Sequence, residues 1–489
     1  MRKTFALIVC FGFNALAQAP AGAPTDKAVS VSKVERKNRA PVSKEILRVK
    51  LPNPIQATLE NGLTVLIMED HRLPNVTLQL IIKGAGALDE PANMPGLAST
   101  TAQMLREGTT IRQSKQIAEE TDRLGASLFA SSGFGSPEAM VSASGLSDNF
   151  DQWFALVTDV LLHPSFPASE LDKMKQRQLV SLRQQRSSPA FLAAERFNRA
   201  VYGDFPAAIV SATPESIQAM TPEMLSQWHR ERYVPQNAIL GIAGDVNAAQ
   251  LIPKLKTALA AWKKTDFEEK LPPNPKPVTE KRILLVNRPN SVQTNLILGN
   301  IAIDRRSPDY IPMTVMNRVL GGGGAARLFI KLREEKGYTY GAYSSFAASQ
   351  FPGPWRATSD VRTEVTDGAM TEFMNELRRI REEKVPTAEL QESEHSLVAN
   401  FALSLEQPAQ LLGYAITRKI YGLPDDYWDT YPAKIAAVTA DDVERVAKKY
   451  LDLDTVQIVA VGDAVKIKTA LEKYGPVTVY DMEGKAAAN

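Results

Sequence analysis

Few side chains in this sequence are of the types that hold a catalytic metal ion. The 489 residues include 4 histidines, and none has another within one helical turn, the spacing at which two imidazoles of a helix share a metal. Glu394-His395 comes closest to such a pair, but Gln391 stands at the position of the first histidine, four residues before His395. We therefore expect surface or hydrogen-bonded core histidines, with a metal site built from distant residues as the alternative. The histidines are His71, His163, His229 and His395.

A single cysteine and a run of glycines are the other features that suggest chemistry. Cys10 is the only cysteine and lies in a predicted export signal, so the mature chain would have no disulfide, no cysteine nucleophile and no cysteine metal ligand. The glycines at 321–324 lead into Ala325-Ala326-Arg327, whereas a phosphate-binding loop would end in Gly-Lys-Ser/Thr. We interpret the run as a flexible turn before a helix, not as a nucleotide site.

The N-terminus has the features of an export signal. A basic start, Arg2-Lys3, precedes a mostly apolar run, residues 5–17, that is too short to span a bilayer. The run ends in Ala15-Leu16-Ala17, the pattern of small residues after which signal peptidases cleave. We predict a signal peptide, residues 1–17, cleaved after Ala17, and a periplasmic or secreted bacterial protein. The alternatives are a lipoprotein anchored at Cys10 and a buried N-terminal helix.

The charge balance excludes broad classes of partner. The 57 Lys and Arg residues, less Arg2 and Lys3, leave 55 against 55 Asp and Glu. A neutral chain presents no extended field for nucleic acid or anionic lipid, so we expect no nucleic-acid partner. No apolar stretch after residue 17 is long enough to cross a membrane, and we expect no transmembrane segment in the mature chain.

Turn and cap residues outline the elements that must position any site. Asn61-Gly62, between apolar runs at 55–59 and 63–68, predicts a β-hairpin because both turn residues tolerate positive φ. Ser114 is expected to cap a helix that stops at Gly125. Helical patterns dominate from about residue 149 to 202.

The two portions on either side of a central linker resemble each other. Residues 263–281 are rich in Lys, Glu and Pro, which predicts an extended, semi-rigid segment. The helix start at Thr221 recurs at Thr439, and the Gly-Asp pair at Gly244 recurs at Gly462, both 218 residues later. We predict a duplicated α+β unit of about 220 residues. The alternative is a coincidence between amphipathic helices.

Several short motifs follow one another along the chain in a fixed order. They are Gly96-Leu97-Ala98, Met104-Leu105, Gly108-Thr109, Tyr202-Gly203-Asp204-Phe205-Pro206, Tyr233-Val234-Pro235-Gln236-Asn237-Ala238 and Gly244-Asp245-Val246. In order and spacing they resemble the insulinase/pitrilysin family of metallopeptidases, over about residues 50–480. The resemblance implies two homologous α/β sandwich domains that form a clamshell around a chamber.

The zinc-binding motif of that family is missing here. Active members carry H-x-x-E-H on the helix after the first motif, where two histidines hold zinc and the glutamate acts on the bound water. Ser99, Ala102 and Gln103 stand at these positions, and Gln176 stands where we align the distal glutamate. Neutral side chains do not hold Zn²⁺ as imidazole and carboxylate do. We predict no metal, no cofactor and no catalytic residue in this chain.

The second portion carries another feature of the family, an arginine and a tyrosine seven residues apart. In the family this pair reaches across to the zinc site of the other portion or subunit. Arg333 and Tyr340 match it, and we expect Arg333 in the last turn of a helix and Tyr340 just inside a strand. The resemblance implies that Arg333 donates to substrate carbonyls and Tyr340 to the tetrahedral intermediate. The alternative is that Arg333 pairs with Glu334 and Tyr340 packs in a sheet.

The resemblance implies a non-catalytic, substrate-binding subunit of a heterodimeric zinc metalloendopeptidase. A homologous partner chain would supply the H-x-x-E-H zinc site, and the substrates would be unfolded peptides. The alternatives are a non-enzymatic scaffold of the same fold and an independent hydrolase with a rebuilt site. The predicted segments are the signal peptide 1–17, a flexible N-terminal segment 18–50, a degenerate first domain 51–262, the linker 263–281 and a second domain 282–489.

Overall fold

The computed structural model describes residues 46–487. The predicted signal peptide, residues 1–17, and all but the end of the predicted N-terminal segment, residues 18–50, lie outside the described residues. Within residues 46–487, no helix is long and apolar enough to cross a bilayer.

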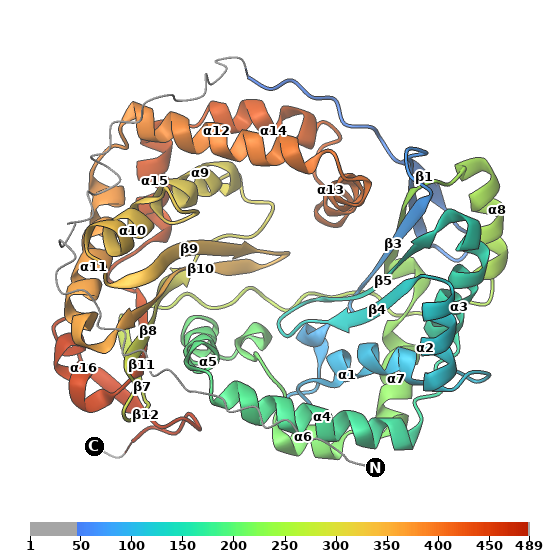
Figure 1. The fold of residues 1–489 in the computed structure, drawn as a ribbon, viewed down its shortest axis with the longest axis horizontal. Coiled ribbons are helices and arrows are strands. Elements are labelled where there is room, and N and C mark those ends of the chain that lie inside the picture. Colours follow the sequence, from blue (N-terminus) through green and yellow to red (C-terminus); the bar gives the residue numbers. More distant parts are fainter. Residues whose placement is uncertain (1–45, 488–489) are drawn as a thin grey trace, which may run out of the picture. The chain divides into compact units, whose positions relative to one another are not determined.

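The first half of the fold is built on a six-stranded mixed sheet with the order β1-β2-β6-β3-β5-β4 (Figure 1). The predicted hairpin at Asn61-Gly62 is confirmed, because β1 and β2 pair antiparallel on either side of it. Its strands are β1 (Ile55–Thr58), β2 (Thr64–Glu69), β3 (Asn75–Lys83), β4 (Ser127–Ser132), β5 (Glu138–Leu146) and β6 (Ala238–Gly244). Its helices are α1 (Leu97–Met104), α2 (Ser114–Arg123), α3 (Phe150–Leu162), α4 (Ala168–Arg186), α5 (Pro189–Tyr202), α6 (Pro214–Ala219), α7 (Pro222–Arg232) and α8 (Ala248–Ala258).

The predicted cap of α2 is wrong by one residue. Ser114 is the first residue of the helix, and its hydroxyl donates to the Glu107 carboxylate at 2.7 Å. The cap is Gln113, whose backbone N–H donates to the side chain of Gln116 at 2.8 Å. The helix therefore begins one residue earlier than predicted, and the serine hydroxyl binds the segment before the helix instead of capping its first turn.

The second half is built on another six-stranded sheet, ordered β12-β7-β11-β8-β10-β9. Its strands are β7 (Arg282–Asn287), β8 (Gln293–Ile301), β9 (Thr339–Ala348), β10 (Pro352–Arg362), β11 (Gln457–Gly462) and β12 (Val477–Tyr480). Its helices are α9 (Tyr310–Leu320), α10 (Arg327–Phe329), the π-helix η7 (Ile330–Glu335), α11 (Thr366–Glu382), α12 (Thr387–Ser404), α13 (Pro408–Tyr421), α14 (Tyr427–Ala436), α15 (Ala440–Tyr450) and α16 (Ala464–Glu472).

The prediction of two homologous α+β units is confirmed by the strand topology. The order β2-β6-β3-β5-β4 of the first sheet matches β7-β11-β8-β10-β9 of the second. β2 runs parallel to β6 as β7 does to β11, and the other equivalent neighbours are antiparallel. β7 begins 218 residues after β2, and β8 begins 218 residues after β3. Only the outer strands β1 and β12 come from different places in the chain, so the duplicated unit is the five-stranded part.

The two halves exchange a helix across their sheets. α5 of the first half packs Phe197 and Val201 on Ile297 of β8 and on the buried strands β7 and β11. α13 of the second half packs Leu412 and Ile416 on β2, β3 and β6. Figure 1 shows α5 beside the second sheet and α13 beside the first. On one face, each sheet is therefore covered by helices of its own half. On the other face, it is partly covered by a helix of the other half.

Glycines in the strands allow this close helix packing. A Cβ on Gly299 of β8 would lie 2.8 Å from the Phe197 ring, and one on Gly241 of β6 would lie 2.8 Å from side-chain carbons of Leu412 and Ile416. Neither contact leaves room for a larger side chain. The exchange therefore depends on small residues at two particular points of the sheets.

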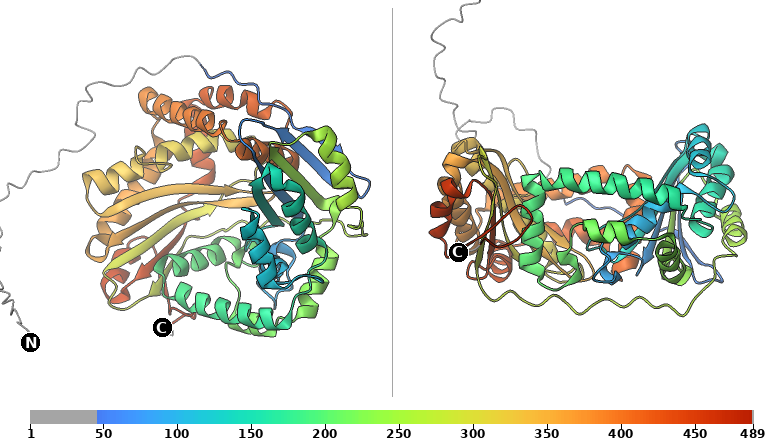
Figure 2. Two further views of the ribbon diagram at one scale, coloured as in Figure 1. Left: turned by 45° about the vertical axis from the view of Figure 1, so that its right-hand side comes forward. Right: turned by 90° about the horizontal axis from the view of Figure 1, so that it is seen from below.

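The linker is bound to the first half over part of its length. Residues 263–281 contain neither helix nor strand, and Figure 2 shows this segment extended. The side chain of Gln236 donates to the Thr265 carbonyl at 2.8 Å, and Lys83 pairs with Glu269 at 3.0 Å. The Phe267 ring lies under the Arg232 guanidinium, 4.6 Å from its centroid. These contacts hold the linker on the protein surface.

We predict that Phe197→Ala destabilises the whole described fold, not the first half alone. Phe197 is fully buried in the contact between α5 and the second sheet, so its truncation should cost about 3–5 kcal/mol of unfolding free energy. Urea unfolding followed by circular dichroism and by tryptophan fluorescence measures the loss. Phe129→Ala, at a side chain that is 59% exposed, is the control and should cost far less. Unfolding of one half with the other unaffected would contradict the exchanged packing.

Candidate functional site

Helix α1 starts at a glycine and is fixed there by a buried carboxylate. Gly96 precedes the helix with φ of 96°, a conformation that favours glycine. The Glu90 carboxylate accepts hydrogen bonds from the backbone N–H groups of Gly96 at 2.9 Å and Ala98 at 2.6 Å. These are N–H groups that the first turn of a helix leaves without partners. Burial raises the pKa of Glu90 to about 7, although both hydrogen bonds lower it.

The residues at the family's zinc-binding positions line a small cavity whose one charged lining residue, among residues 46–487, is Arg177. Ser99 and Gln103 face a cavity of about 290 Å³, and the Gln103 amide donates to the Ser99 hydroxyl at 3.1 Å. Ala102 lies between them and is fully buried in the core. Helix α1 thus brings together the three positions predicted from the sequence. They carry a hydroxyl (Ser99), a methyl (Ala102) and an amide (Gln103).

The facing helix α4 does not bring Gln176 to this cavity. Gln176 is exposed to solvent and is absent from the cavity wall. Gln178 and Ser181 line it instead, and the Gln178 amide donates to the Thr100 hydroxyl at 3.0 Å. Arg177, one position beyond Gln176, also lines the cavity, so the lining residues of α4 lie on either side of the position chosen from the sequence but do not include it. An alignment by spacing alone could not determine the rotation of this helix.

These side chains do not fit a zinc ion. The walls offer hydroxyl groups, amide groups and the cationic side chain of Arg177, whereas Zn²⁺ takes imidazole, thiolate and carboxylate donors. Within residues 46–487, no group of three or more His, Cys, Asp or Glu side chains is placed to hold a metal. His229 is one of the core histidines expected from the sequence. Its Nε2 lies 2.8 Å from the Leu161 carbonyl oxygen, and burial lowers its pKa to about 4.

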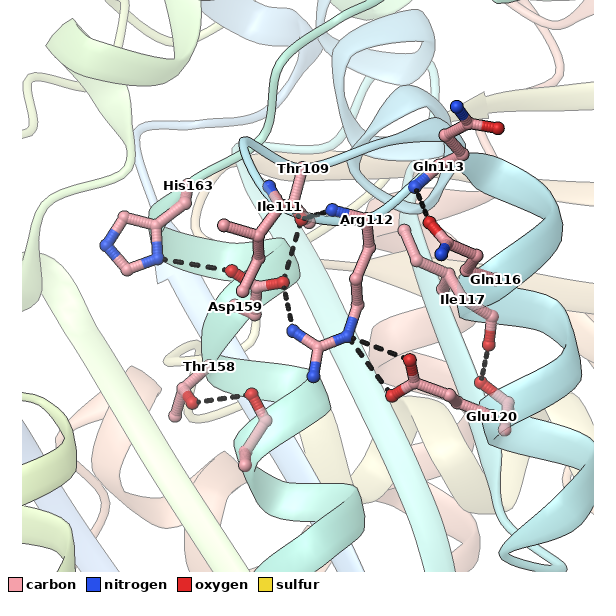
Figure 3. Close-up of polar contacts among 12 residues, drawn as sticks. Thr109, Ile111, Arg112, Gln113, Gln116, Ile117, Glu120, Thr158, Asp159 and His163 are labelled. Carbon is pink, nitrogen blue, oxygen red and sulfur yellow. Dashed lines mark hydrogen bonds and ion pairs between the residues drawn. The ribbon is translucent and has the colours of Figure 1, made fainter.

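A buried ionic network still fixes the turn after α1, although the metal-binding residues are absent (Figure 3). The Asp159 carboxylate accepts from the Thr109 hydroxyl at 2.8 Å and from Arg112 Nη1 at 2.7 Å. Arg112 also donates from Nε to Glu120 of α2. The network ties the Gly108-Thr109 motif to α2 and α3. The motif residues thus support the helix packing and not a metal.

Arg333 lies in the last turn of a helix, as expected, and that turn is the π-helix η7. Its guanidinium lies over the Phe329 ring, 4.8 Å from the centroid, and its Nε is 3.5 Å from Glu334. The Phe329 ring is in turn 5.6 Å from the ring of Tyr343 on β9. The side chain of Arg333 remains 46% exposed, so the long contact with Glu334 leaves donors free. Single π-turns are frequent at functional sites.

Tyr340 is displaced from the sheet by a β-bulge. Ser359 pairs with Ala342 and Val361 with Thr339, so Tyr340 and Gly341 of β9 together face one residue of β10. Such a bulge changes the direction of a side chain that would otherwise follow the alternation of the strand. Tyr340 is 88% exposed, and its hydroxyl has no partner among residues 46–487. It does not pack in the sheet, which was the alternative considered from the sequence.

Two hydroxyl groups build the bulge. Thr339 Oγ1 donates to the Asp360 carbonyl at 2.6 Å and accepts from the Gly341 N–H at 3.1 Å. Ser359 Oγ donates to the Gly341 carbonyl at 2.9 Å. Sequence reasoning missed both residues. The glycine directly after Tyr340 was the available signal, because strand glycines often accompany bulges.

Tyr340 lines a second, larger cavity. Its volume is about 630 Å³, and it lies between β8, β9 and β10 and the start of α5. Tyr343 and Arg356 also line it, together with Ala190 and Ala194 of α5. The exchanged helix is therefore one wall of the space beside the candidate substrate-binding tyrosine.

Comparisons of the sequence give matches along most of its length. A family model described as "Insulinase (Peptidase family M16)" matches residues 64–214, and one described as "Peptidase M16 inactive domain" matches residues 219–397. An uncharacterized zinc protease of Rickettsia felis is 27% identical over 424 residues, 83% of this chain and 97% of that protein. A protein of Helicobacter pylori named a non-peptidase homolog is 23% identical over 415 residues, 83% of this chain and 93% of that protein.

Solved structures give the same fold. A crystal structure of a peptidase M16 inactive domain from Pseudomonas fluorescens has a TM-score of 0.79 and 28% identity, and covers 84% of this chain and 98% of that one. The periplasmic protease PqqL of Escherichia coli has a TM-score of 0.72 at 15% identity, over 88% of this chain and 49% of PqqL. At that identity the second likeness concerns the fold alone.

We predict that Glu90 makes the stability of the fold fall as the pH rises. A carboxyl group whose pKa is raised in the folded state keeps its proton where the unfolded chain has lost it, so stability falls between about pH 4.5 and 7. Relative to Glu90→Gln, the unchanged protein should lose up to about 3 kcal/mol of unfolding free energy over this range. Urea titrations at several pH values measure it. The exposed Glu215→Gln is the control, and a pH-independent difference for Glu90→Gln would contradict the assignment.

We predict that Thr339→Val loosens the bulge that presents Tyr340. The valine keeps the shape of threonine but removes the hydroxyl that the Gly341 N–H and the Asp360 carbonyl share. Loss of one such hydrogen bond costs about 1 kcal/mol, so the Gly341 amide should exchange its proton several-fold faster. Hydrogen exchange followed by NMR measures the rate. Thr339→Ser keeps the hydroxyl and should exchange like the unchanged protein; equal rates for Val and Ser would argue against this role.

Proposed function

Because the chain belongs to the insulinase (M16) family of peptidases, we propose that it is the non-catalytic, substrate-binding subunit of a heterodimeric zinc metallopeptidase. A homologous partner chain with an H-x-x-E-H motif supplies the zinc, its ligands and the general base. This chain supplies Arg333 and Tyr340. Export to a bacterial periplasm or to the exterior belongs to the same proposal and rests on the N-terminal sequence.

One contrast carries the proposal. Helix α1 places a hydroxyl, a methyl and an amide where the family holds its metal, at Ser99, Ala102 and Gln103. In the other half, a bulge presents Tyr340 to solvent with a free hydroxyl. A buried aromatic residue would serve the sheet better than an exposed one, because an 88% exposed ring forgoes most of its hydrophobic stabilisation. Exposure at that cost is consistent with a role in binding.

The chemistry assigned to each residue follows from its donors. Tyr340 Oη donates a hydrogen bond to the oxyanion that develops when water attacks a peptide carbonyl in the partner's site. The Arg333 guanidinium offers forked donors to a neighbouring substrate carbonyl and holds the chain in register. The ring of Phe329 beneath the guanidinium limits its motion while the outer N–H groups stay free.

The edge of the second sheet suits an extended peptide. β9 pairs with β10 on one side only, but its other side is occupied at Ser344, whose N–H donates to the Gly321 carbonyl at 2.9 Å and whose carbonyl accepts from the Asn317 amide at 3.2 Å. The open part of this edge is therefore the stretch before Ser344, next to Tyr340. An unfolded peptide could add there as a further strand, with its side chains alternating between the two faces. Such binding uses backbone hydrogen bonds and accepts many sequences, as expected for a degradative peptidase.

The names of two similar proteins support a lack of activity in the isolated chain, whereas the Rickettsia felis relative is named an uncharacterized zinc protease. The Helicobacter pylori relative is named a non-peptidase homolog, and the Pseudomonas fluorescens structure is named an inactive domain. A non-enzymatic scaffold of the same fold would share this property. A scaffold, however, would have no use for the bulge or for a free hydroxyl on Tyr340.

We predict that turnover by the reconstituted pair depends on Tyr340 and Arg333. The assay mixes this chain with the H-x-x-E-H-bearing homologue from the same genome and follows cleavage of a quenched fluorescent peptide. Tyr340→Phe removes only the hydroxyl and should lower kcat by on the order of 10²–10³-fold with little change in KM. Arg333→Ala should mainly raise KM, and Arg333→Lys should recover only part of the loss because the forked geometry is gone.

The controls separate this function from its alternatives. Met482→Ala, at a partly exposed side chain outside the second cavity, should leave both kcat and KM unchanged. Turnover that survives both Tyr340→Phe and Arg333→Ala would leave a scaffold as the better description. A purified single chain that bound one Zn²⁺ tightly and cleaved peptides by itself would reject the heterodimer altogether.

A further inference from the structure

The cavity beside Tyr340 contains an arginine that has no counter-charge. Arg356 of β10 is partly buried and lines this cavity of about 630 Å³. Its guanidinium makes no hydrogen bond or ion pair with any group among residues 46–487. On the sheet it stands opposite Gly299 of β8 and Ser345 of β9, and neither residue can neutralise it.

The one carboxylate in the same cavity is turned to a different partner. Asp360 lies four residues further along β10, which corresponds to about 13 Å on one face of a strand. Its Oδ1 accepts a hydrogen bond from the amide of Asn295 at 2.7 Å. The cavity therefore has a positive end at Arg356 and a separate, already hydrogen-bonded carboxylate at the other end.

The exchanged helix makes room for a ligand at the sheet. α5 begins at Pro189, and its first turns present Ala190 and Ala194 to the cavity, whereas Phe197 further along fills the space against the sheet. Small side chains at the start of the helix thus leave a hollow that a larger side chain would close. The hollow has the volume of sites that bind several ligand side chains or a small molecule.

Arg356 is partly buried and has water as the partner of its guanidinium, so a ligand with the opposite charge can bind it by displacing that water. Burial removes water from a charged group, and that cost is recovered only when an opposite charge with good hydrogen-bond geometry approaches. A guanidinium matches a carboxylate in particular, because two parallel N–H groups can donate to its two oxygens. Tyr340 and Tyr343, both exposed at the mouth, offer aromatic surface to the neighbouring residues of an extended chain.

We propose that Arg356 is a specificity residue that binds an Asp or Glu side chain of the substrate peptide. This inference rests on the proposed function, since it assumes that a peptide lies along the second sheet near Tyr340. The acidic side chain enters the hollow beside α5 and pairs with the guanidinium, while the peptide backbone stays at the edge strand β9. The substrate class is thereby narrowed to unfolded peptides with an acidic residue near the cleaved bond.

Direct peptide binding to the full mature chain tests this. Two fluorescein-labelled, unstructured twelve-residue peptides, identical except for one central Glu or Gln, are titrated with the protein and followed by anisotropy. The Glu peptide should bind about 10-fold tighter or more, as expected for a charge-assisted pair, and the preference should shrink as salt is added. Arg356→Gln should abolish the preference and leave binding of the Gln peptide unchanged. Arg356→Lys should keep a reduced preference.

Arg362→Gln is the matched control. Arg362 is on the same strand but outside the cavity, where it pairs with Glu364 at 3.1 Å, so its removal should leave the preference intact. Equal binding of the two peptides to the unchanged protein would overturn the inference and leave the proposed function standing. If neither peptide bound, both the acidic specificity and the proposed function would be rejected. Loss of Gln-peptide binding in a folded Arg356→Gln variant, checked by its melting temperature, would overturn the acidic specificity.

Discussion

The exchange of α5 and α13 between the two halves is the constraint on which the rest of the structure depends. α5 covers apolar strands of the second sheet through Phe197 and Val201, and α13 covers the first sheet through Leu412 and Ile416. Neither sheet is fully buried by the helices of its own half. The two halves therefore stabilise each other, as the two sides of a large hydrophobic interface do. The same packing makes α5 a wall of the cavity beside Tyr340.

The β-bulge in β9 determines which way the side chain of Tyr340 points. A regular strand would continue the alternation of β9 and turn the ring of Tyr340 toward one face of the sheet. The extra residue and the hydroxyl of Thr339 change that direction and leave the ring in solvent. Arg333 reaches the same region through the contacts of Phe329 with Tyr343. Strand, π-turn and exchanged helix thus converge on one surface from separate parts of the sequence.

The first half fixes helix α1 at both ends, although α1 presents none of the side chains that hold zinc in the H-x-x-E-H motif. Glu90 still holds the start of α1, and the ionic network around Asp159 still holds its end. Between them, the Gln103 amide donates to the Ser99 hydroxyl in a cavity that no carboxylate or imidazole of the described residues lines. Buried charges of this kind are costly to remove singly, because each would leave a partner unsatisfied. The supports are therefore part of the fold's stability whether or not a metal is bound nearby.

The sequence by itself determined the family, the duplicated α+β unit and the loss of metal-binding side chains, because these follow from residue types and from spacing along the chain. It also placed the hairpin at Asn61-Gly62, a local turn that its two residues specify. Tertiary structure decided the rest. The facing residues of α4 include Gln178 and Ser181 but not Gln176, because helix rotation is set by packing. The exchange of helices and the position of Arg356 beside α5 depend on contacts between residues far apart in the sequence, which no local pattern records.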